Sequence, residues 1–138
     1  MAKRKPKTIA GLVNDAAVIL QRVVRLKAAD ENGYAQCVTC GRVDHYTNMD
    51  GGHFISRKHT AHKLLEENIH ACCKGCNGFL NGNMIPYTIF MIDTYGREFV
   101  DELEATKNET RKYSRQEILG IIDDLKHYEK QVREQKGL

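Results

Sequence analysis

Apolar residues recur at helical spacing near both ends of this 138-residue chain. Near the N-terminus, Thr8 can cap a helix that we expect to end around the Asn32-Gly33 turn. Its apolar positions share one face: Ile9, Leu12, Val13, Ala16, Leu20, Val23 and Val24. Near the C-terminus, Ser114 and Glu117 form a capping-box pattern ahead of a second helix. Its stripe predicts burial in the core or against a partner helix, with a dimer seam as the alternative: Ile118, Ile121, Ile122, Leu125, Tyr128 and Val132.

The pattern between these helices is different. Residues 34–82 hold all five cysteines and all but one of the six histidines, with few large apolar side chains. Beyond them, Pro86 suits the first turn of a helix that Gly96 ends, and a short helix follows over residues 97–105. We therefore expect one compact domain in three parts: a basic tail and helix (1–33), a central core (34–83) and a helical region (84–138).

Composition and charge indicate the cellular compartment and the type of binding partner. No run of 18 apolar residues and no secretory signal is present, which favours a cytoplasmic protein without a membrane span. Net charge is only +3, but the N-terminal tail is basic through Lys3, Arg4 and Lys5. Such a tail suits a polyanion such as DNA, although it is also compatible with a solvated tail.

Two Cys-x-x-Cys knuckles, Cys37/Cys40 and Cys73/Cys76, bracket the centre of the chain. Each knuckle can present two thiolates to one ion, and two pairs complete the tetrahedral shell of a structural zinc ion (Zn2+). Two local disulfides or a redox pair are the alternatives. Cys72 is expected to be a spare thiol packed under the second knuckle.

The order His53, Asn68, Asn77 within this cysteine frame resembles the HNH (ββα-metal) nucleases. The resemblance implies a zinc-stapled ββα core of α+β class flanked by helices, in which a β-hairpin carries the first histidine. By position, it makes His53 the general base, Asn77 a ligand of a catalytic divalent ion, and Asn68 the residue that ties the hairpin together. The ion would be Mg2+, with Mn2+ as the alternative.

Three longer stretches resemble the NinG (Rap) recombination endonucleases of lambdoid phages: DGGHFISRKH, ENIHACCKGCNGFLNGNMIPY and FVDELEATKNETRKYS. That family implies nicking or resolution of branched DNA, such as Holliday junctions and D-loops, in the bacterial host cell. The cysteines followed by Asn77 are also similar to phage recombination endonuclease VII.

The sequence leaves two candidates, Asp50 and His70, for the second protein ligand of the catalytic ion. Many HNH enzymes carry an acid directly before the histidine, where this chain has Gly52. We expect Gly51 and Gly52 to form a bulge that turns Asp50 back to the metal; otherwise His70, projecting from the paired strand, is the ligand.

The sequence thus predicts a magnesium-dependent endonuclease for branched DNA, acting as a homodimer that cuts opposing strands. Arg57 and Lys58 would contact phosphate, or simply form a solvated face. Two other functions stay open: an HNH nickase acting on linear duplex DNA in packaging or defence, and a non-catalytic zinc module that binds DNA or a protein.

Overall fold

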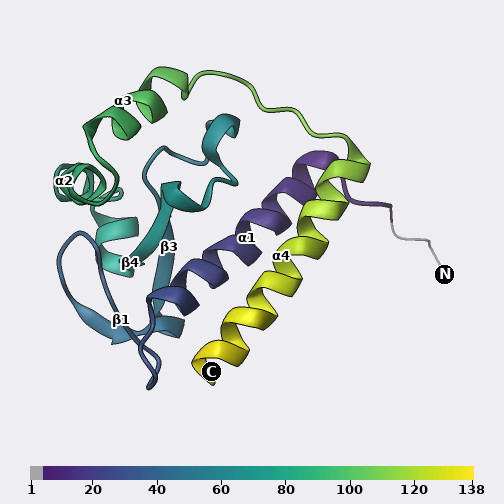
Figure 1. Ribbon diagram of the computed structural model, residues 1–138. Coiled ribbons are helices and arrows are strands. Elements are labelled where there is room, and N and C mark those ends of the chain that lie inside the picture. The colour runs from purple at the N-terminus through teal and green to yellow at the C-terminus, as the bar shows by residue number, and fades with distance from the viewer. Residues whose placement is uncertain (1–4) are drawn as a thin grey trace.

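The computed structural model describes residues 5–138 and combines helices with two small antiparallel sheets, which confirms the α+β class. The helices are α1 (Ile9–Ala28), α2 (Met84–Tyr95), α3 (Arg97–Thr106) and α4 (Arg115–Lys136). The first hairpin pairs β1 (Tyr34–Gln36) with β2 (Val43–His45), and the second pairs β3 (Met49–His53) with β4 (Ile69–Cys73). In Figure 1, β3 and β4 lie between the α1–α4 pair and the α2–α3 pair.

Helices α1 and α4 form the scaffold on one side of the hairpin (Figure 1). Both expected caps are present: the Thr8 hydroxyl accepts from the Gly11 N–H, and Ser114 and Glu117 make a reciprocal capping box. The two apolar stripes meet in one buried cluster that includes Leu12, Ala16, Ile19, Val23, Ile118, Ile122 and Val132. The C-terminal stripe therefore packs within the chain, as the core interpretation predicted.

One ion-pair network links the same two helices at their edge. Arg22 donates two hydrogen bonds to the Glu129 carboxylate, at 2.9 and 3.2 Å, and Arg133 donates a third at 3.1 Å. These charge-assisted bonds lower the pKa of Glu129, with the Arg22 bond as the largest cause. Because Glu129 is largely shielded from solvent, the network helps to fix the angle at which α4 crosses α1.

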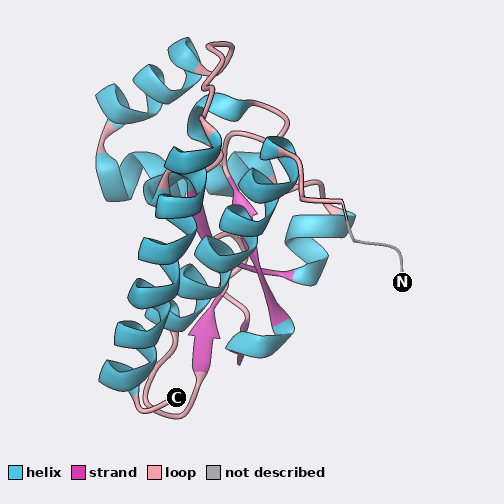
Figure 2. Cartoon of the chain, turned by 90° about the vertical axis from the view of Figure 1, so that its right-hand side faces the viewer, coloured by secondary structure: helices cyan, strands magenta, loops and turns pink. Residues whose placement is uncertain are grey.

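The β3–β4 hairpin lies directly on α1, behind the long helices in the view of Figure 2. Its register is continuous from Met49 opposite Cys73 to His53 opposite Ile69, with Gly51 opposite Ala71 and Gly52 opposite His70. Each residue of β3 faces one residue of β4, so the predicted bulge at the glycine pair is wrong.

The two glycines allow close packing instead. A Cβ atom at Gly51 would lie 2.7 Å from Cβ and 2.9 Å from Cα of Gln21, in α1. A Cβ atom at Gly52 would lie 2.8 Å from Sγ of Cys72 and 3.0 Å from Oδ1 of Asn77. Real Cβ atoms essentially never come within 3.0 Å of other heavy atoms, and a contact of 3.0 Å is already tight. Gly51 therefore lets the hairpin touch α1, and Gly52 leaves room for Cys72 and Asn77.

A second core lies on the other side of the hairpin. Tyr87 and Met91 of α2 and Val100 and Leu103 of α3 are buried in it together with four of the five cysteines, Cys37, Cys72, Cys73 and Cys76. The Tyr87 hydroxyl donates a 2.7 Å hydrogen bond to the Gly52 carbonyl and so ties α2 to β3. None of the helices within residues 5–138 has the length and apolar character needed to cross a membrane.

We expect Gly51→Ala to lower the free energy of unfolding by about 1–3 kcal/mol, because the added methyl group displaces the α1 backbone from the hairpin. Gly120→Ala is the matched control: a Cβ atom there meets nothing within 4 Å, and alanine favours the helix interior. Urea unfolding monitored by circular dichroism measures both. Equal stability of the two variants would show that the close approach to Gln21 does not matter.

Candidate active site

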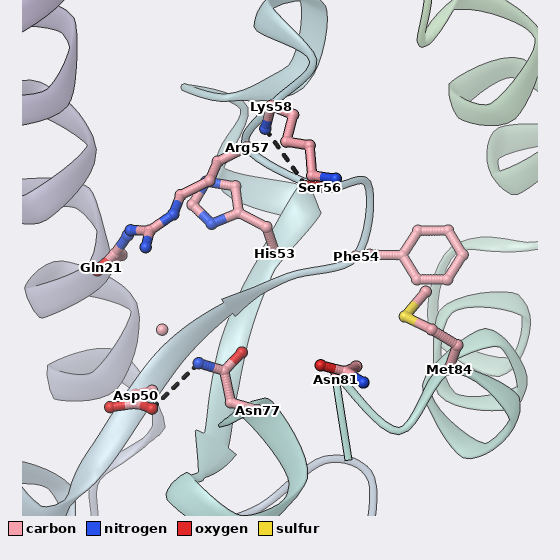
Figure 3. Close-up of a pocket in the computed structure, with 12 residues that line it drawn as sticks. Gln21, Asp50, His53, Phe54, Ser56, Arg57, Lys58, Asn77, Asn81 and Met84 are labelled. Atoms are coloured by element: carbon pink, nitrogen blue, oxygen red, sulfur yellow. Dashed lines mark hydrogen bonds between the residues drawn. The ribbon is translucent and has the colours of Figure 1, made fainter. Parts of the chain in front are cut away.

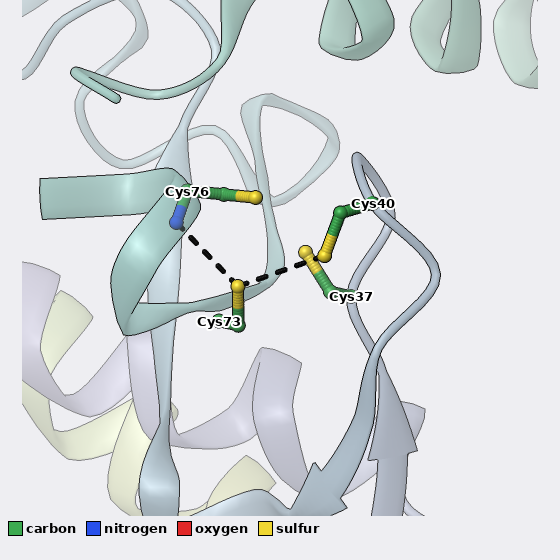
Figure 4. Close-up of side chains that lie close together, drawn as sticks. All are labelled: Cys37, Cys40, Cys73 and Cys76. Carbon is green, nitrogen blue, oxygen red and sulfur yellow. Dashed lines mark hydrogen bonds between the residues drawn. The ribbon is translucent and has the colours of Figure 1, made fainter. Parts of the chain in front are cut away.

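Four cysteines gather at one end of the β3–β4 hairpin (Figure 4). The Sγ atoms of Cys37, Cys40, Cys73 and Cys76 all lie within 4.8 Å of one another, and all five cysteines of the chain are free thiols. Zinc–sulfur bonds of about 2.3 Å give a tetrahedron with edges of about 3.8 Å. The Cys40–Cys73 separation of 3.7 Å matches such an edge, so the cluster can hold a zinc ion.

The cluster is connected to its surroundings by hydrogen bonds that orient the sulfurs. The Cys76 N–H points at Sγ of Cys73 at 3.4 Å, and the Asn83 side-chain amide points at Sγ of Cys76 at 3.6 Å. Next to Cys37, the Val38 N–H donates to the Ala71 carbonyl at 3.1 Å. The cluster thereby joins three segments at one point: the β1–β2 turn, the end of β4 and the chain up to Asn83.

Cys72 stands apart from the cluster, as expected. Its side chain is fully buried next to Gly52, and it is not among the four cysteines whose sulfurs converge. Burial raises the pKa of the Cys72 thiol. This cysteine is therefore an inert core residue.

A polar cavity of about 650 Å³ opens beside β3 (Figure 3). Asp50 and His53 of β3 line it together with Asn77, which lies in the π-helical turn Gly75–Phe79 after the second knuckle. Arg57 and Lys58 line the same cavity from the loop that follows β3. The structure thus brings together five of the predicted site residues.

Asp50 and Asn77 form a directly bonded pair. The Asn77 amide donates to Oδ2 of Asp50 at 3.0 Å, and the Lys74 ammonium donates to Oδ1 at 2.8 Å. Burial alone would raise the pKa of Asp50, but the bonds from Lys74 and Asn77 outweigh it and lower that pKa. An ionised carboxylate beside an amide oxygen is a donor set suited to a hard divalent cation.

Asp50 reaches Asn77 without a bulge because side chains alternate along a strand. Asp50 and Gly52 share one face of β3, and the π-helical turn packs on that face. Lys74 was missed by the sequence analysis. Its position between the two cysteines of the second knuckle was the available signal, since the knuckle is what aims it at Asp50.

His53 extends into the cavity from the end of β3, on the other side of the cavity from the Asp50–Asn77 pair in Figure 3. Its Nε2 atom lies 2.9 Å from the Lys63 carbonyl oxygen. A carbonyl only accepts, so Nε2 carries the proton and the Nδ1 lone pair is left as the basic position. Burial lowers the pKa of His53, and the charges of Arg57 and Lys63 lower it further. The imidazole is therefore neutral at neutral pH and able to take up a proton.

Asn68 holds the loop that follows His53. It is fully buried, its Oδ1 accepts from the Ile55 N–H at 2.8 Å, and its Nδ2 donates to the carbonyls of Ile55 and His62 at 3.0 and 3.2 Å. Lys63, the partner of His53, lies in the same loop. Asn68 thus ties the loop after β3 to the start of β4; its role in orienting His53 stays a prediction.

His70 is a predicted site residue that does not line the cavity. Its Nδ1 lies 3.0 Å from the Tyr87 hydroxyl and its Nε2 lies 2.7 Å from the Tyr95 hydroxyl. Burial lowers the pKa of His70 to about 4. We therefore correct the expectation of a metal-binding or catalytic His70: this neutral ring joins β4 to α2.

Of the predicted DNA-binding residues in the tail, Lys5 is exposed, and Lys3 and Arg4 lie outside the described residues. Gln21 also lines the cavity and was not predicted, because nothing in α1 marks which turn of the helix meets β3.

The geometry defines an α+β protein in which a four-cysteine cluster adjoins a polar cavity with a histidine, a carboxylate and an amide. The chain belongs to the NinG family: the family model "Bacteriophage Lambda NinG protein" matches residues 1–136. Protein ninG of Escherichia phage lambda is 34% identical over 76 residues, which cover 54% of this chain and 37% of the relative. Protein ninG of Salmonella phage P22 is 27% identical over 102 residues, covering 73% of this chain and 49% of the relative.

The matched parts therefore span at most about half the length of these curated relatives. No solved structure matches the chain.

We expect one zinc ion per chain. Cys76→Ser should lose it and Cys72→Ala should retain it, because Cys76 belongs to the cluster and Cys72 does not. Elemental analysis of the purified variants measures the metal, and thermal unfolding measures the accompanying loss of stability. Zinc loss in Cys72→Ala, or full zinc in Cys76→Ser, would contradict this assignment of ligands.

Proposed function

We propose that this protein is a metal-dependent DNA endonuclease of the HNH type that cuts branched recombination intermediates. The observation that carries the proposal is the convergence of His53, Asp50 and Asn77 on one cavity, beside a cysteine cluster that fixes the segment carrying Asn77. Membership of the NinG family supports it, because the matched residues include the whole cavity.

In this proposal the catalytic work is divided among the cavity residues. His53 accepts the proton of the attacking water at Nδ1 while the Lys63 carbonyl holds its opposite edge. Asp50 and Asn77 hold a divalent cation, Mg2+ or Mn2+, through their side-chain oxygens. That cation, when bound, offsets the charge that develops on the scissile phosphate.

Lys74 competes with a metal ion for the carboxylate of Asp50. The Lys74 ammonium, which is mostly exposed, sits on Oδ1 of Asp50. Exposed ion pairs are weak, on the order of 0–1 kcal/mol, so a divalent cation can displace Lys74 from the carboxylate. Asn77 must also turn its carbonyl rather than its NH₂ group toward the ion, which is a rotation about one side-chain bond.

DNA would be recognised by charge and shape. Arg57 and Lys58 face the cavity, where they can contact phosphates on either side of the cut, and Lys5 with the rest of the basic tail can contact more distant phosphates. We further propose that two copies act together, because opposing strands of a junction need two cuts. The buried C-terminal stripe leaves the interface to other surfaces.

We expect His53→Ala to lower the cleavage rate of a synthetic four-way junction at least 100-fold in Mg2+, because the general base is lost. His127→Ala is the matched control, since His127 is exposed on α4. Zinc content of each variant checks its fold. For the unaltered protein, the acid limb of the rate profile should have its midpoint below pH 6.5, since the folded environment lowers the pKa of His53.

Three results would redirect the proposal. Undiminished cleavage by His53→Ala would reject the assigned base. Equal cutting of matched linear duplex would favour the nickase, and junction binding without cutting in Mg2+ or Mn2+ would favour a non-catalytic zinc module.

A further inference from the structure

Five large apolar side chains lie exposed in one short part of the chain, at the end of the π-helical turn and along α2. Phe79 is 89% exposed and Ile85 is 80% exposed, and the set is Phe79, Leu80, Met84, Ile85 and Ile89. We call this set the apolar rim. Single exposed apolar residues are ordinary, but a cluster of this kind marks an interaction site.

The apolar rim is continuous with the candidate active site. Met84 belongs to it and also lines the cavity, next to Asn81 and Gly82 (Figure 3). Phe79 precedes Asn81 by two residues in the turn that carries Asn77. A ligand that occupies the cavity therefore has the apolar rim as its immediate neighbour.

The turn that presents Phe79 is firmly held. The Leu80 N–H donates to the Gly75 carbonyl at 2.9 Å, and the Gly82 N–H donates to the carbonyl of Cys76, a cluster residue, at 2.8 Å. Asn81 and Asn83 adopt left-handed backbone conformations on either side of Gly82, which completes the tight turn. The backbone that carries the exposed ring is thus held at a fixed offset from the cavity.

The charge around the apolar rim suits a polyanion. From residue 68 to residue 92 the only charged side chain is Lys74. The acids at the border of the apolar rim are Asp93, one helical turn after Ile89, and Asp50, which is paired with Lys74. Arg57 and Lys58 add positive charge across the cavity. An apolar surface next to a cavity that is lined by basic side chains fits a nucleic acid that exposes bases as well as phosphates.

We propose that Phe79 stacks on an unstacked base at the branch point of the DNA and so places the adjoining phosphate in the cavity. This inference rests on the proposed function and names the residue that makes it selective for branched substrates. Bases at a branch point are free to unstack, whereas those of a linear duplex must first be pulled from the helix. Aromatic rings bind exposed bases through their faces without reading sequence.

A second copy of the chain is the competing occupant of the apolar rim. Standard protein interfaces use roughly 20–30 residues a side, whereas the apolar rim has five, and the polar cavity opens at its border. These observations favour DNA, and the oligomeric state becomes an outcome of the test.

The test uses the full chain carrying His53→Ala, so that binding is measured without chelator and without cutting. The probe is a four-way junction with 2-aminopurine at the branch point, together with a linear duplex that carries the same label. Phe79→Ala is compared with Phe79→Tyr, which keeps the ring, and with Leu119→Ala, which removes an exposed apolar side chain from α4. Affinity, fluorescence and sedimentation are recorded for each.

We expect Phe79→Ala to lower the ratio of junction to duplex affinity about tenfold and to abolish quenching of the 2-aminopurine. Phe79→Tyr should keep both signals, and Leu119→Ala should change neither. An unchanged ratio with unchanged quenching in Phe79→Ala would overturn the proposal. So would conversion of a dimer to a monomer in Phe79→Ala with quenching retained, which would assign the apolar rim to self-association.

These outcomes are separate from a failure of the proposed function. Undiminished cutting of the junction by the His53→Ala protein would reject the general base, yet the quenching data would still report whether Phe79 meets a base. The reverse case is a protein that cuts the junction and depends on His53 to do so, but does not quench the 2-aminopurine. That result would reject the stacking of Phe79 and leave the proposed function standing.

Discussion

The convergence of four cysteines at the end of the β3–β4 hairpin is the interaction on which the candidate site depends. The central segment has few large apolar residues, so packing alone cannot fix its turns. The cluster joins the β1–β2 turn to the end of β4, and the residues between and after the second pair of cysteines carry Lys74, Asn77 and the turn to Asn83. One ion held there by four thiolates would stabilise the segment that carries Lys74, Asn77 and the turn to Asn83, which lies along the cavity.

The second constraint is the close contact of β3 with α1. Gly51 allows the strand to touch Gln21, and α1 is in turn held against α4 by the buried apolar cluster and by the Arg22–Glu129 ion pair. The cavity therefore lies between a rigid helical scaffold and a segment anchored by cysteines. This arrangement lets polar residues occupy β3, since the strand does not need their side chains for packing.

Local signals in the sequence were sufficient for the helices and the cysteine cluster. The Thr8 cap, the Ser114–Glu117 capping box and the apolar stripes act within a few residues, and the two Cys-x-x-Cys pairs carry their own geometry. The order of His53, Asn68 and Asn77 likewise pointed to residues that the fold places together or, for Asn68, in a supporting position. The features that were predicted wrongly depend on contacts between distant segments.

The glycine pair and His70 show this limit. Gly51 and Gly52 were expected to bend the strand. They instead allow close packing against Gln21 and Asn77, and no local pattern in the sequence places these residues beside them. His70 was expected in the cavity, but Tyr87 and Tyr95 of α2 occupy both of its ring nitrogens. His70 lies opposite Gly52 and so shares the face of the hairpin that carries Asp50, but α2 packs on that part of the face and its tyrosines bind the imidazole.

Amide hydrogen exchange with and without zinc tests most directly whether the cysteine cluster holds the site together. In the zinc-bound protein we expect slow exchange at Val38 and Gly82, whose N–H groups bond to Ala71 and Cys76. Removal of the zinc should speed exchange at these two amides by orders of magnitude, while the buried Val23 of α1 stays protected by the helical core. Unchanged protection at Val38 and Gly82 in zinc-free protein would contradict the account.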